Sequence, residues 1–296
     1  MSRLLLIVNP AAGMGRGAAL EGEIAHLYAS QGWRVTLCET AAAGDAERFA
    51  LEEAASHELV LCVGGDGTLS DTLGGLIRVP NAPSLCYVPM GSTNDLAQSA
   101  GLPHDPLEAA AVGLNGRPLP IDAGTFNGQI FSYVACFGAF TRTSYETDRA
   151  LKNRIGHLAY VLSGIQELGR IESYPVTIAY DGEEISDEFI FGSVCNTRSL
   201  GGILKLPLGY ENLRDGLHEL IMVRKPKRAT DLGSLLSSLL GGHLDHPLLV
   251  YQQIANAVFT MPAEMPWSLD GERADAGERV EIMNLRHAYQ LMIPGK

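Results

Sequence analysis

The chain has 296 residues, 46% of them hydrophobic, which is enough for two domains that each bury a core. Its 22 basic and 34 acidic residues give a net charge of -12, and this balance argues against a nucleic-acid surface and a polybasic membrane anchor. Five scattered cysteines without a C-x-x-C pair disfavour zinc and redox motifs, and no apolar run is long enough to span a bilayer. A reduced, cytoplasmic setting is therefore expected.

Strands and helices are expected to alternate through the first part of the chain. Short apolar runs predict the strands, and apolar residues at helical spacing predict the helices between them. The expected strands are residues 4–8, 33–38, 59–63 and 85–88, and the expected helices are residues 18–31, 43–55, 69–76, 94–100 and 107–114. This order predicts a parallel sheet with right-handed crossovers, in which ligands bind where the strands end.

The most informative motif is Gly64-Gly65-Asp66-Gly67-Thr68, which lies between an apolar strand and the start of a helix. Its glycines let the backbone approach a bulky anion closely and leave main-chain N–H groups available to bind it. The helix start adds its positive dipole end. One acid, Asp66, lies inside this anion site. An acid at that place is explained if a metal ion accompanies the anion, and a nucleotide polyphosphate with Mg²⁺ is the obvious candidate.

Three further segments follow strands of the same predicted sheet. They are Asn9-Pro10 with the loop after it, Thr40, and residues 89–93. Because the C-terminal ends of parallel strands share one edge of a sheet, we expect these segments to meet at the edge that carries Asp66.

The pattern changes near Pro118-Leu119-Pro120. Short β-rich runs follow at residues 129–135, 176–180, 185–195, 217–223, 257–261 and 279–283, and helical spacing returns at residues 156–168 and 229–240. Asn127-Gly128 and Asp181-Gly182 are strong signals for hairpin turns. We therefore expect a second, mainly antiparallel domain.

The ordered motifs resemble the catalytic domain of diacylglycerol kinases. The matching segments are Asn9-Pro10-Ala11-Ala12-Gly13, Gly64–Thr68, Gly91-Ser92-Thr93-Asn94-Asp95, Ile121-Asp122, Asn196, Asp215-Gly216-Leu217 and Asp270-Gly271-Glu272. Nearly the whole chain is similar to bacterial lipid kinases of the YegS and DgkB type, whose eukaryotic relatives include sphingosine and ceramide kinases.

This resemblance implies both a fold and a reaction. The fold class is an α/β nucleotide-binding domain with a parallel sheet over residues 1–119 and the C-terminal segment 285–296, and a mainly antiparallel β-sandwich domain for the lipid acceptor over residues 120–284. The reaction is transfer of the γ-phosphoryl group of Mg-ATP to a lipid hydroxyl, such as that of a diacylglycerol or a sphingoid-type alcohol. ATP and Mg²⁺ are the implied cofactors.

The resemblance also assigns contacts to the nucleotide. The residues expected to hold it are Asn9, Pro10, Ala11, Ala12, Gly13, Thr40, Gly64, Gly65, Asp66, Gly67, Thr68, Leu69, Ser70, Asp71 and Thr93. Asp66 is expected to act through Mg²⁺, and Asn94-Asp95 to brace the turn before it. The chain departs from the family at Ala12, where many relatives have serine, and at Ser70-Asp71, where they often have Asn-Glu.

The base of the reaction is assigned to Asp270-Gly271-Glu272. A carboxylate beside the lipid hydroxyl would deprotonate it, since a free alcohol is a poor nucleophile at neutral pH. Glu272 is favoured and Asp270 is the close alternative. Asp181-Gly182-Glu183 has the same three letters but is interpreted as an exposed hairpin turn.

A structural Mg²⁺ site is implied around Asp215. Its side chain would bind the ion together with the main-chain oxygens of Asn212 and Leu217, since oxygen-only ligands suit Mg²⁺. The alternative is an ordinary Asp-Gly turn before a strand.

Two other functions stay open. An NAD kinase or another kinase of soluble metabolites would share the first domain, although residues 91–95 and the Asp215 region favour the lipid branch. A nucleotide-binding regulator without catalysis is left open by the departures at Ala12, Ser70 and Asp71. The expected partners are ATP and a lipid alcohol, with no nucleic acid. Peripheral contact with the inner face of a membrane, for which the leucine-rich segment from Leu232 is a candidate, and a homodimer are left open.

Overall fold

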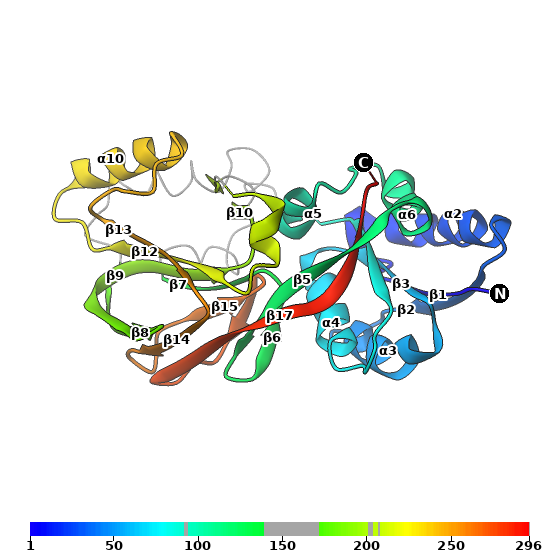
Figure 1. Ribbon diagram of the computed structural model, residues 1–296, viewed down its shortest axis with the longest axis horizontal. Helices are drawn as coiled ribbons and strands as arrows, with labels where there is room; N and C mark the ends of the chain where they lie inside the picture. Colours follow the sequence, from blue (N-terminus) through cyan, green and yellow to red (C-terminus); the bar gives the residue numbers. More distant parts are fainter. Residues whose placement is uncertain (92–93, 139–171, 201–203, 207, 296) are drawn as a thin grey trace. The chain divides into compact units, whose positions relative to one another are not determined.

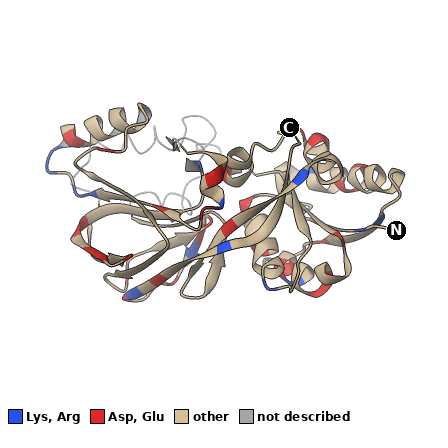
Figure 2. Ribbon diagram, in the orientation of Figure 1, with Lys and Arg blue, Asp and Glu red and all other residues tan. Residues whose placement is uncertain are grey.

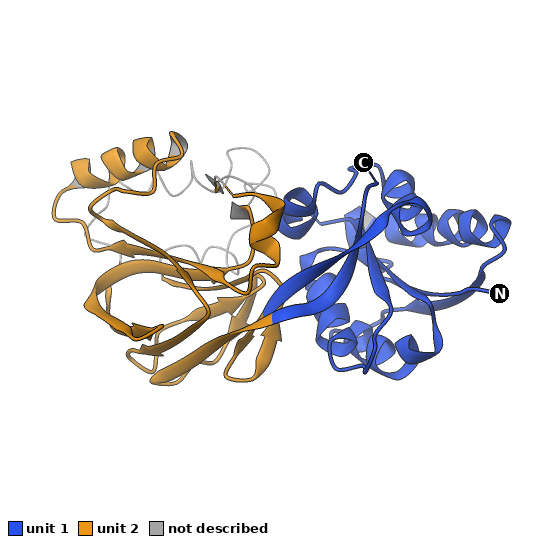
Figure 3. Ribbon diagram, in the orientation of Figure 1, with its two compact units in different colours: residues 1–123, 286–296 blue, residues 124–285 orange. Residues whose placement is uncertain are grey.

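The computed structural model describes residues 1–91, 94–138, 172–200, 204–206 and 208–295. The chain divides into two compact units, which are Met1–Ala123 with Arg286–Lys296 (unit 1) and Gly124–Leu285 (unit 2; Figure 3). Two strands, β5 (Arg117–Phe126) and β17 (Arg279–Ile293), contain the residues at which the chain passes from one unit to the other.

Unit 1 is built on a parallel sheet (Figure 1). Its strand order is β17-β4-β3-β1-β2, with β1 at Arg3–Val8, β2 at Arg34–Glu39, β3 at Leu59–Gly64 and β4 at Ser84–Pro89. The pairings of β1 with β2, of β1 with β3 and of β3 with β4 are all parallel. The predicted parallel sheet is confirmed, and its strands lie within a residue of the expected ranges.

Most helices of unit 1 contact the strands of this sheet. The helical segments of the unit are α1 (Ala12–Gly15), α2 (Gly17–Ser30), α3 (Asp45–Glu53), the 3-10 turn η1 (Ala54–Ser56), α4 (Asp66–Leu76), α5 (Asp95–Ala100) and α6 (Pro106–Asn115). Helix α2 buries Leu20, Ile24 and Tyr28, because residues four apart share one face of a helix. The Tyr28 hydroxyl donates to the carbonyl of Ala110 in α6 at 2.9 Å, and burial raises the pKa of that hydroxyl. All six residues of β3 are buried, as expected for a central strand of a parallel sheet covered on both faces.

Unit 2 is mainly antiparallel. Its strands are β6 (Gln129–Phe131), β7 (Val134–Gly138), β8 (Tyr174–Tyr180), β9 (Glu183–Cys195), β10 (Ser199–Leu200), β11 (Leu204–Lys205), β12 (His218–Arg224), β13 (Leu249–Ile254), β14 (Asn256–Thr260), β15 (Trp267–Leu269) and β16 (Glu272–Ala274). Strand β9 pairs with β7, β8 and β12, and all three pairings are antiparallel. The predicted antiparallel domain is confirmed. The helix expected at residues 156–168 lies outside the described residues.

Two helical segments are described in unit 2, η3 (Tyr210–Leu213) and α10 (Ala229–Leu240). Leu232 and Leu235 of α10 are buried in a cluster that includes Ile221 and Val223 of β12, so this helix packs on the sheet. Among the helices of the described ranges, none combines the length and the apolar character that crossing a membrane requires.

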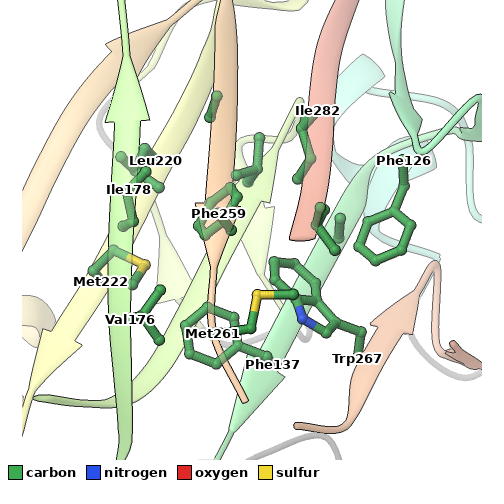
Figure 4. Close-up of a cluster of buried hydrophobic side chains, with 14 of the residues drawn as sticks. Phe126, Phe137, Val176, Ile178, Leu220, Met222, Phe259, Met261, Trp267 and Ile282 are labelled. Carbon is green, nitrogen blue, oxygen red and sulfur yellow. The ribbon is translucent and has the colours of Figure 1, made fainter. Parts of the chain in front are cut away.

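The core of unit 2 is centred on Trp267, which is completely buried (Figure 4). Its ring centroid lies 4.9 Å from that of Phe137, 5.0 Å from that of Phe126 and 5.3 Å from that of Phe259. These rings come from four different strands, and aromatic contacts of this kind add to the stabilisation from burial alone. The core therefore fixes β15, and with it the turn that follows at Asp270-Gly271.

Three hairpins of unit 2 share one turn geometry. Asn127-Gly128, Asp181-Gly182 and Asp270-Gly271 each have two successive residues with positive φ. The flanking pairs are Phe126 with Gln129, Tyr180 with Glu183, and Leu269 with Glu272. Two positive φ values identify the tight hairpin turn that matches the twist of the strands, for which Asn-Gly and Asp-Gly are the preferred sequences. The two hairpin turns predicted from the sequence are confirmed.

Candidate functional site

The candidate phosphate site of unit 1 begins where β3 ends. Gly65 is extended and precedes α4, so Asp66 is the first residue of that helix. The amide of Leu69 donates to the Gly65 carbonyl at 3.0 Å, whereas the amides of the first three helical residues have no acceptor within the helix. Such amides, together with the helix dipole, attract an anion.

Two glycines of this turn, Gly64 and Gly65, are closely packed. A Cβ at Gly64 would overlap the side chain of Thr68, and a Cβ at Gly65 would lie 3.3 Å from the Cα of Gly91. Gly67 and Ser70 are partly exposed in the first turns of α4, whereas the side chain of Leu69 is fully buried in the core. The side chain of Leu69 thus anchors the start of α4 in the core, and its amide already donates to the Gly65 carbonyl.

The loop after β1 is tied to the same helix. The Asn9 side chain donates from Nδ2 to Thr68 Oγ1 at 3.1 Å and accepts at Oδ1 from the Ala11 amide at 3.0 Å. Gly13 has φ +60°, and a Cβ there would lie 2.5 Å from Cε of Met90. The Ala12 amide donates to the Asn9 carbonyl at 3.1 Å, so Pro10 and Ala11 form a tight turn between β1 and α1, which begins at Ala12.

The loop after β4 is held by Asn94. This residue has φ +52°, and its side chain accepts from the Gly91 amide at 2.9 Å and donates to the Gly91 carbonyl at 2.8 Å. The Asn94 amide donates to Oδ2 of Asp66 at 3.0 Å, which joins this loop to the start of α4. The expected bracing of the turn by Asn94 is confirmed. Thr93, which was expected to contact the nucleotide, lies outside the described residues.

Tyr87 is a part of this site that the sequence analysis missed. Its hydroxyl donates towards the Gly64 carbonyl at 3.2 Å and towards Oδ1 of Asn94 at 3.3 Å, so it links the two glycine turns from beneath. Burial raises the pKa of Tyr87 well above its usual value, and the negative charge of Asp66 adds to the effect. In the sequence Tyr87 is one more apolar-strand residue, and nothing marks its hydroxyl.

The loop after β2 is the fourth segment that follows a strand of the parallel sheet. Thr40 is partly buried, and its amide donates to the Val8 carbonyl at 2.9 Å. Asp45 accepts from the amides of Ala41 and Ala42 at 2.9 Å each, and these bonds lower the pKa of Asp45. Asp71 of α4 accepts from the Gly44 amide at 3.1 Å and so connects this loop to α4.

In unit 2, Asp270 and Glu272 have different surroundings. Asp270 is 5% exposed and its carboxylate accepts four hydrogen bonds from residues 132–134, while its own amide donates to the Val134 carbonyl at 2.8 Å. Glu272 is exposed at the start of β16. A proton acceptor has to be reachable by the hydroxyl group that it deprotonates, and Glu272 meets this condition.

The residues assigned to a structural Mg²⁺ form a compact turn. Asp215 accepts at Oδ1 from the Leu217 amide at 3.0 Å and at Oδ2 from Nδ2 of Asn212 at 3.3 Å. Asn212 in turn accepts from the Gly209 amide at 3.0 Å. These bonds bring together the three residues that the sequence analysis named. In the described part of the chain, no group of three or more His, Cys, Asp or Glu side chains could hold a metal ion.

Two buried titratable side chains on β12 were also missed. His218 is fully buried, and burial lowers its pKa to about 4. Glu219 is 1% exposed; Gln253 donates to its Oε1 at 3.3 Å, and no hydrogen bond to its Oε2 comes from the described residues. Burial raises the pKa of Glu219 to about 8, and the charge of Asp215 adds to that rise.

Two family models match consecutive parts of the chain. The diacylglycerol kinase catalytic domain matches residues 3–126, and the YegS C-terminal NAD kinase beta sandwich-like domain matches residues 134–284. The chain belongs to the diacylglycerol kinase family. The predicted family and the prediction of a lipid kinase are thereby confirmed.

Named diacylglycerol kinases resemble the chain over most of its length. The diacylglycerol kinase of Bacillus subtilis (strain 168) is 32% identical over 296 residues, which covers 99% of this chain and 97% of the relative. That of Staphylococcus carnosus (strain TM300) is 31% identical and covers 91% of this chain and 88% of the relative. A crystal structure of a diacylglycerol kinase from Bacillus anthracis str. Sterne superposes with a TM-score of 0.81 at 25% identity, covering 99% of this chain and 97% of that chain. The glycine turns of unit 1 lie within the range matched to the diacylglycerol kinase catalytic domain, and the Asp270-Gly271-Glu272 turn lies within the range matched to the YegS C-terminal domain.

Proposed function

We propose that this member of the diacylglycerol kinase family transfers the γ-phosphoryl group of Mg-ATP to the hydroxyl of a lipid, such as a diacylglycerol or a sphingoid-type alcohol. The observation that carries the proposal is the joining of three strand ends at the start of α4. Asn9 bonds to Thr68, and the Asn94 amide bonds to Asp66. A polyphosphate needs several backbone amides held in fixed positions, and these loops are suited to supply them.

Asp66 is the residue that we assign to Mg²⁺ at the nucleotide. It is a partly buried carboxylate in the first turn of α4, and the Asn94 amide orients its Oδ2. Carboxylate oxygens are ligands that Mg²⁺ prefers, so this residue fits the ion. When bound, the ion neutralises charge on the phosphates. The α4 amides then hold the phosphate oxygens, and Asn94 keeps Asp66 in place.

Glu272 is the residue that we assign as the base. Its carboxylate would accept the proton of the lipid hydroxyl while the lipid oxygen forms its bond to the γ-phosphorus and ADP leaves.

The acceptor is tested with labelled ATP and a panel of alcohols in mixed micelles. The panel contains a diacylglycerol, a sphingoid base, a ceramide, glycerol and NAD. We expect labelled product with one or more of the neutral lipids and none with glycerol or NAD. Phosphorylation of NAD would favour the alternative of an NAD kinase, and absence of product from every lipid with folded, ATP-binding protein would refute the proposal.

The base is tested with Glu272→Gln, and the second Asp-Gly-Glu turn offers a matched control. Glu272→Gln should bind ATP with unchanged affinity and lose turnover by about 10²–10⁴-fold, the usual contribution of a general base. Glu183→Gln, the same substitution in the same kind of turn, should leave turnover unchanged. Equal turnover of both variants would contradict the assignment of Glu272 as the base, and ATP binding without turnover in the wild-type protein would favour a binding protein without catalysis.

The Asp215 turn is the proposed site of a structural Mg²⁺. Side-chain oxygen of Asp215 and main-chain oxygens of Asn212 and Leu217 are hard ligands, and the turn already brings these residues together. The ion would hold the segment between η3 and β12 and would take no part in proton transfer.

Peripheral contact with an anionic membrane is proposed for the segment before α10. Four of the 22 basic residues lie between residues 224 and 228, and Figure 2 shows this basic segment beside α10. Arg224 is paired with Asp187 at 3.0 Å and Lys225 with Glu188 at 2.5 Å. Lys227 and Arg228 are exposed, and no acid of the described ranges forms an ion pair with them.

Each such cation contributes about 1 kcal/mol near an anionic surface. Sedimentation with phosphatidylglycerol vesicles should therefore weaken in Lys227→Glu/Arg228→Glu and not in Lys225→Glu.

A further inference from the structure

The carboxylate of Asp270 is enclosed by donors from the segment that leads into β7. Its Oδ2 accepts from the Ser132 amide at 2.6 Å and from the Ser132 hydroxyl at 2.8 Å. Its Oδ1 accepts from the amides of Tyr133 and Val134, both at 3.0 Å. An ionised carboxylate has about four lone-pair sites, so these bonds occupy them all.

We propose that Asp270 is a positioning residue and that Glu272 alone accepts the proton of the acceptor hydroxyl. This inference rests on the proposed lipid kinase function. A base needs a lone pair that points at the substrate proton, and the side chain of Asp270 is buried with both oxygens already bonded. Glu272 is exposed two residues further along the chain.

The bonds to Asp270 fix the place of Glu272. The carboxylate holds residues 132–134, and the Asp270 amide donates back to the Val134 carbonyl at 2.8 Å. Beyond the turn, Glu272 pairs with Leu269, and Leu269 pairs with Ala135 of β7. The position of Glu272 is therefore set by one connected group of strands, in which Asp270 joins the turn to the start of β7. Loosening this group would move the base relative to the hydroxyl.

The second Asp-Gly-Glu turn shows that the bonds are not needed to make the turn itself. Asp181-Gly182 has the same two positive φ values, 46° and 91°, as Asp270-Gly271, 50° and 95°. Asp181 is exposed, and its side chain accepts from the Ala255 amide at 3.1 Å. A turn of this type forms with a solvated aspartate, so burial of Asp270 among four donors serves the location of the turn.

The test compares Asp270→Asn with Asp181→Asn and Ser132→Ala. In Asp270→Asn, the side-chain NH₂ group would face N–H donors of residues 132–134 and could not accept their hydrogen bonds. Ser132→Ala removes only the hydrogen bond from the Ser132 hydroxyl to Asp270. The first readout is hydrogen exchange of the amides of residues 132–134 and 269–272, which requires no activity. The second readout is the pH dependence of kcat, with KM for ATP measured alongside.

For Asp270→Asn we expect faster exchange in both segments and a fall of about 10²-fold in kcat, the usual effect of a misplaced catalytic group. KM for ATP should stay within about twofold and the acid limb of the pH–rate profile should remain, while Glu272→Gln loses that limb. Ser132→Ala should show smaller changes of the same kind, and Asp181→Asn should match wild type.

Loss of the acid limb in Asp270→Asn would make Asp270 the base and overturn the inference. Unchanged exchange in both segments would also overturn it. If Asp270→Asn does not fold, Ser132→Ala decides. Wild-type rates of hydrogen exchange in both segments of Ser132→Ala would then refute the role of Asp270 in holding the turn. Wild-type protein that phosphorylates no lipid refutes the proposed function, and hydrogen exchange still decides whether Asp270 holds the turn.

Discussion

Replacing Glu219 by glutamine should make the stability of the protein less sensitive to alkaline pH. Glu219 lies on β12 between Cys195 of β9 and Gln253 of β13, and it is 1% exposed. Burial raises its pKa from 4.5 to about 8. Between these two pH values the folded protein keeps a proton that the unfolded chain has released. Stability is therefore highest with respect to this group below pH 4.5 and is lost as the pH rises through 8.

The magnitude follows from the two pKa values. One pH unit in the middle of this interval corresponds to about 1.4 kcal/mol, and the slope is smaller close to each pKa, so ionisation of Glu219 lowers the free energy of unfolding by roughly 3 to 4 kcal/mol between pH 5 and pH 8. His218 acts in the opposite direction, because burial lowers its pKa from 6.5 to about 4 and its stabilisation is lost as the pH falls through this interval. The two effects oppose each other between pH 4.5 and 6.5, and above pH 6.5 the Glu219 effect remains.

The assay is urea unfolding of wild type and Glu219→Gln from pH 5 to pH 8, with EDTA present so that no divalent cation contributes. The difference in free energy of unfolding between the two proteins should change by roughly 3 to 4 kcal/mol in favour of the variant as the pH rises. Glu184→Gln removes the same charge from an exposed position of β9 and should run parallel to wild type. A pH-independent difference between Glu219→Gln and wild type would refute the reasoning, because it would mean that Glu219 ionises in the folded protein as it does in the unfolded chain.

Three further substitutions test other parts of the structure. Trp267→Ala should lower the free energy of unfolding by about 3–5 kcal/mol in denaturant, since it removes a fully buried ring from the core of unit 2; a loss below 1 kcal/mol would contradict this packing. Gly64→Ala should cost about 1–3 kcal/mol and weaken ATP binding in calorimetry, because its methyl group overlaps Thr68; unchanged ATP affinity would contradict the tight turn. Mg²⁺ should raise the Tm of wild type and not that of Asp215→Asn, and an equal rise in both would remove Asp215 from the proposed site.

The order of elements in unit 1 was predictable from the sequence. Strands such as residues 59–63 are continuous apolar runs, and the glycine turn after them has no other local interpretation. Parallel strands expose their C-terminal ends at one edge, so Asn9, Asp66 and Gly91 could be assigned to a common edge without coordinates. The strands, the turns and their common edge follow from the hydrophobic periodicity, the positions of the glycines and the direction of the chain, which are all local properties of the sequence.

Side-chain partners in that site were less predictable. Asn94 was expected to brace its turn, but the hydroxyl of Tyr87 was not expected to link both glycine turns. Leu69 was grouped with the nucleotide contacts, and the structure buries its side chain in the core. A hydrogen bond between residues on different strands depends on register and distance, which no short motif specifies.

The sequence alone determined the two-domain plan, the glycine turns and the positions of two hairpin turns, because these depend on local periodicity and on residues that accept positive φ. The letters of Asp181-Gly182-Glu183 and Asp270-Gly271-Glu272 are the same, and only the resemblance to the family separated the expected base from the expected exposed turn. Only the tertiary structure made Asp181 exposed and Asp270 buried among the donors of residues 132–134. It also enclosed His218 and Glu219, because β12 lies between β9 and β13. Burial is decided by what packs opposite a residue, and that neighbour is remote in the chain.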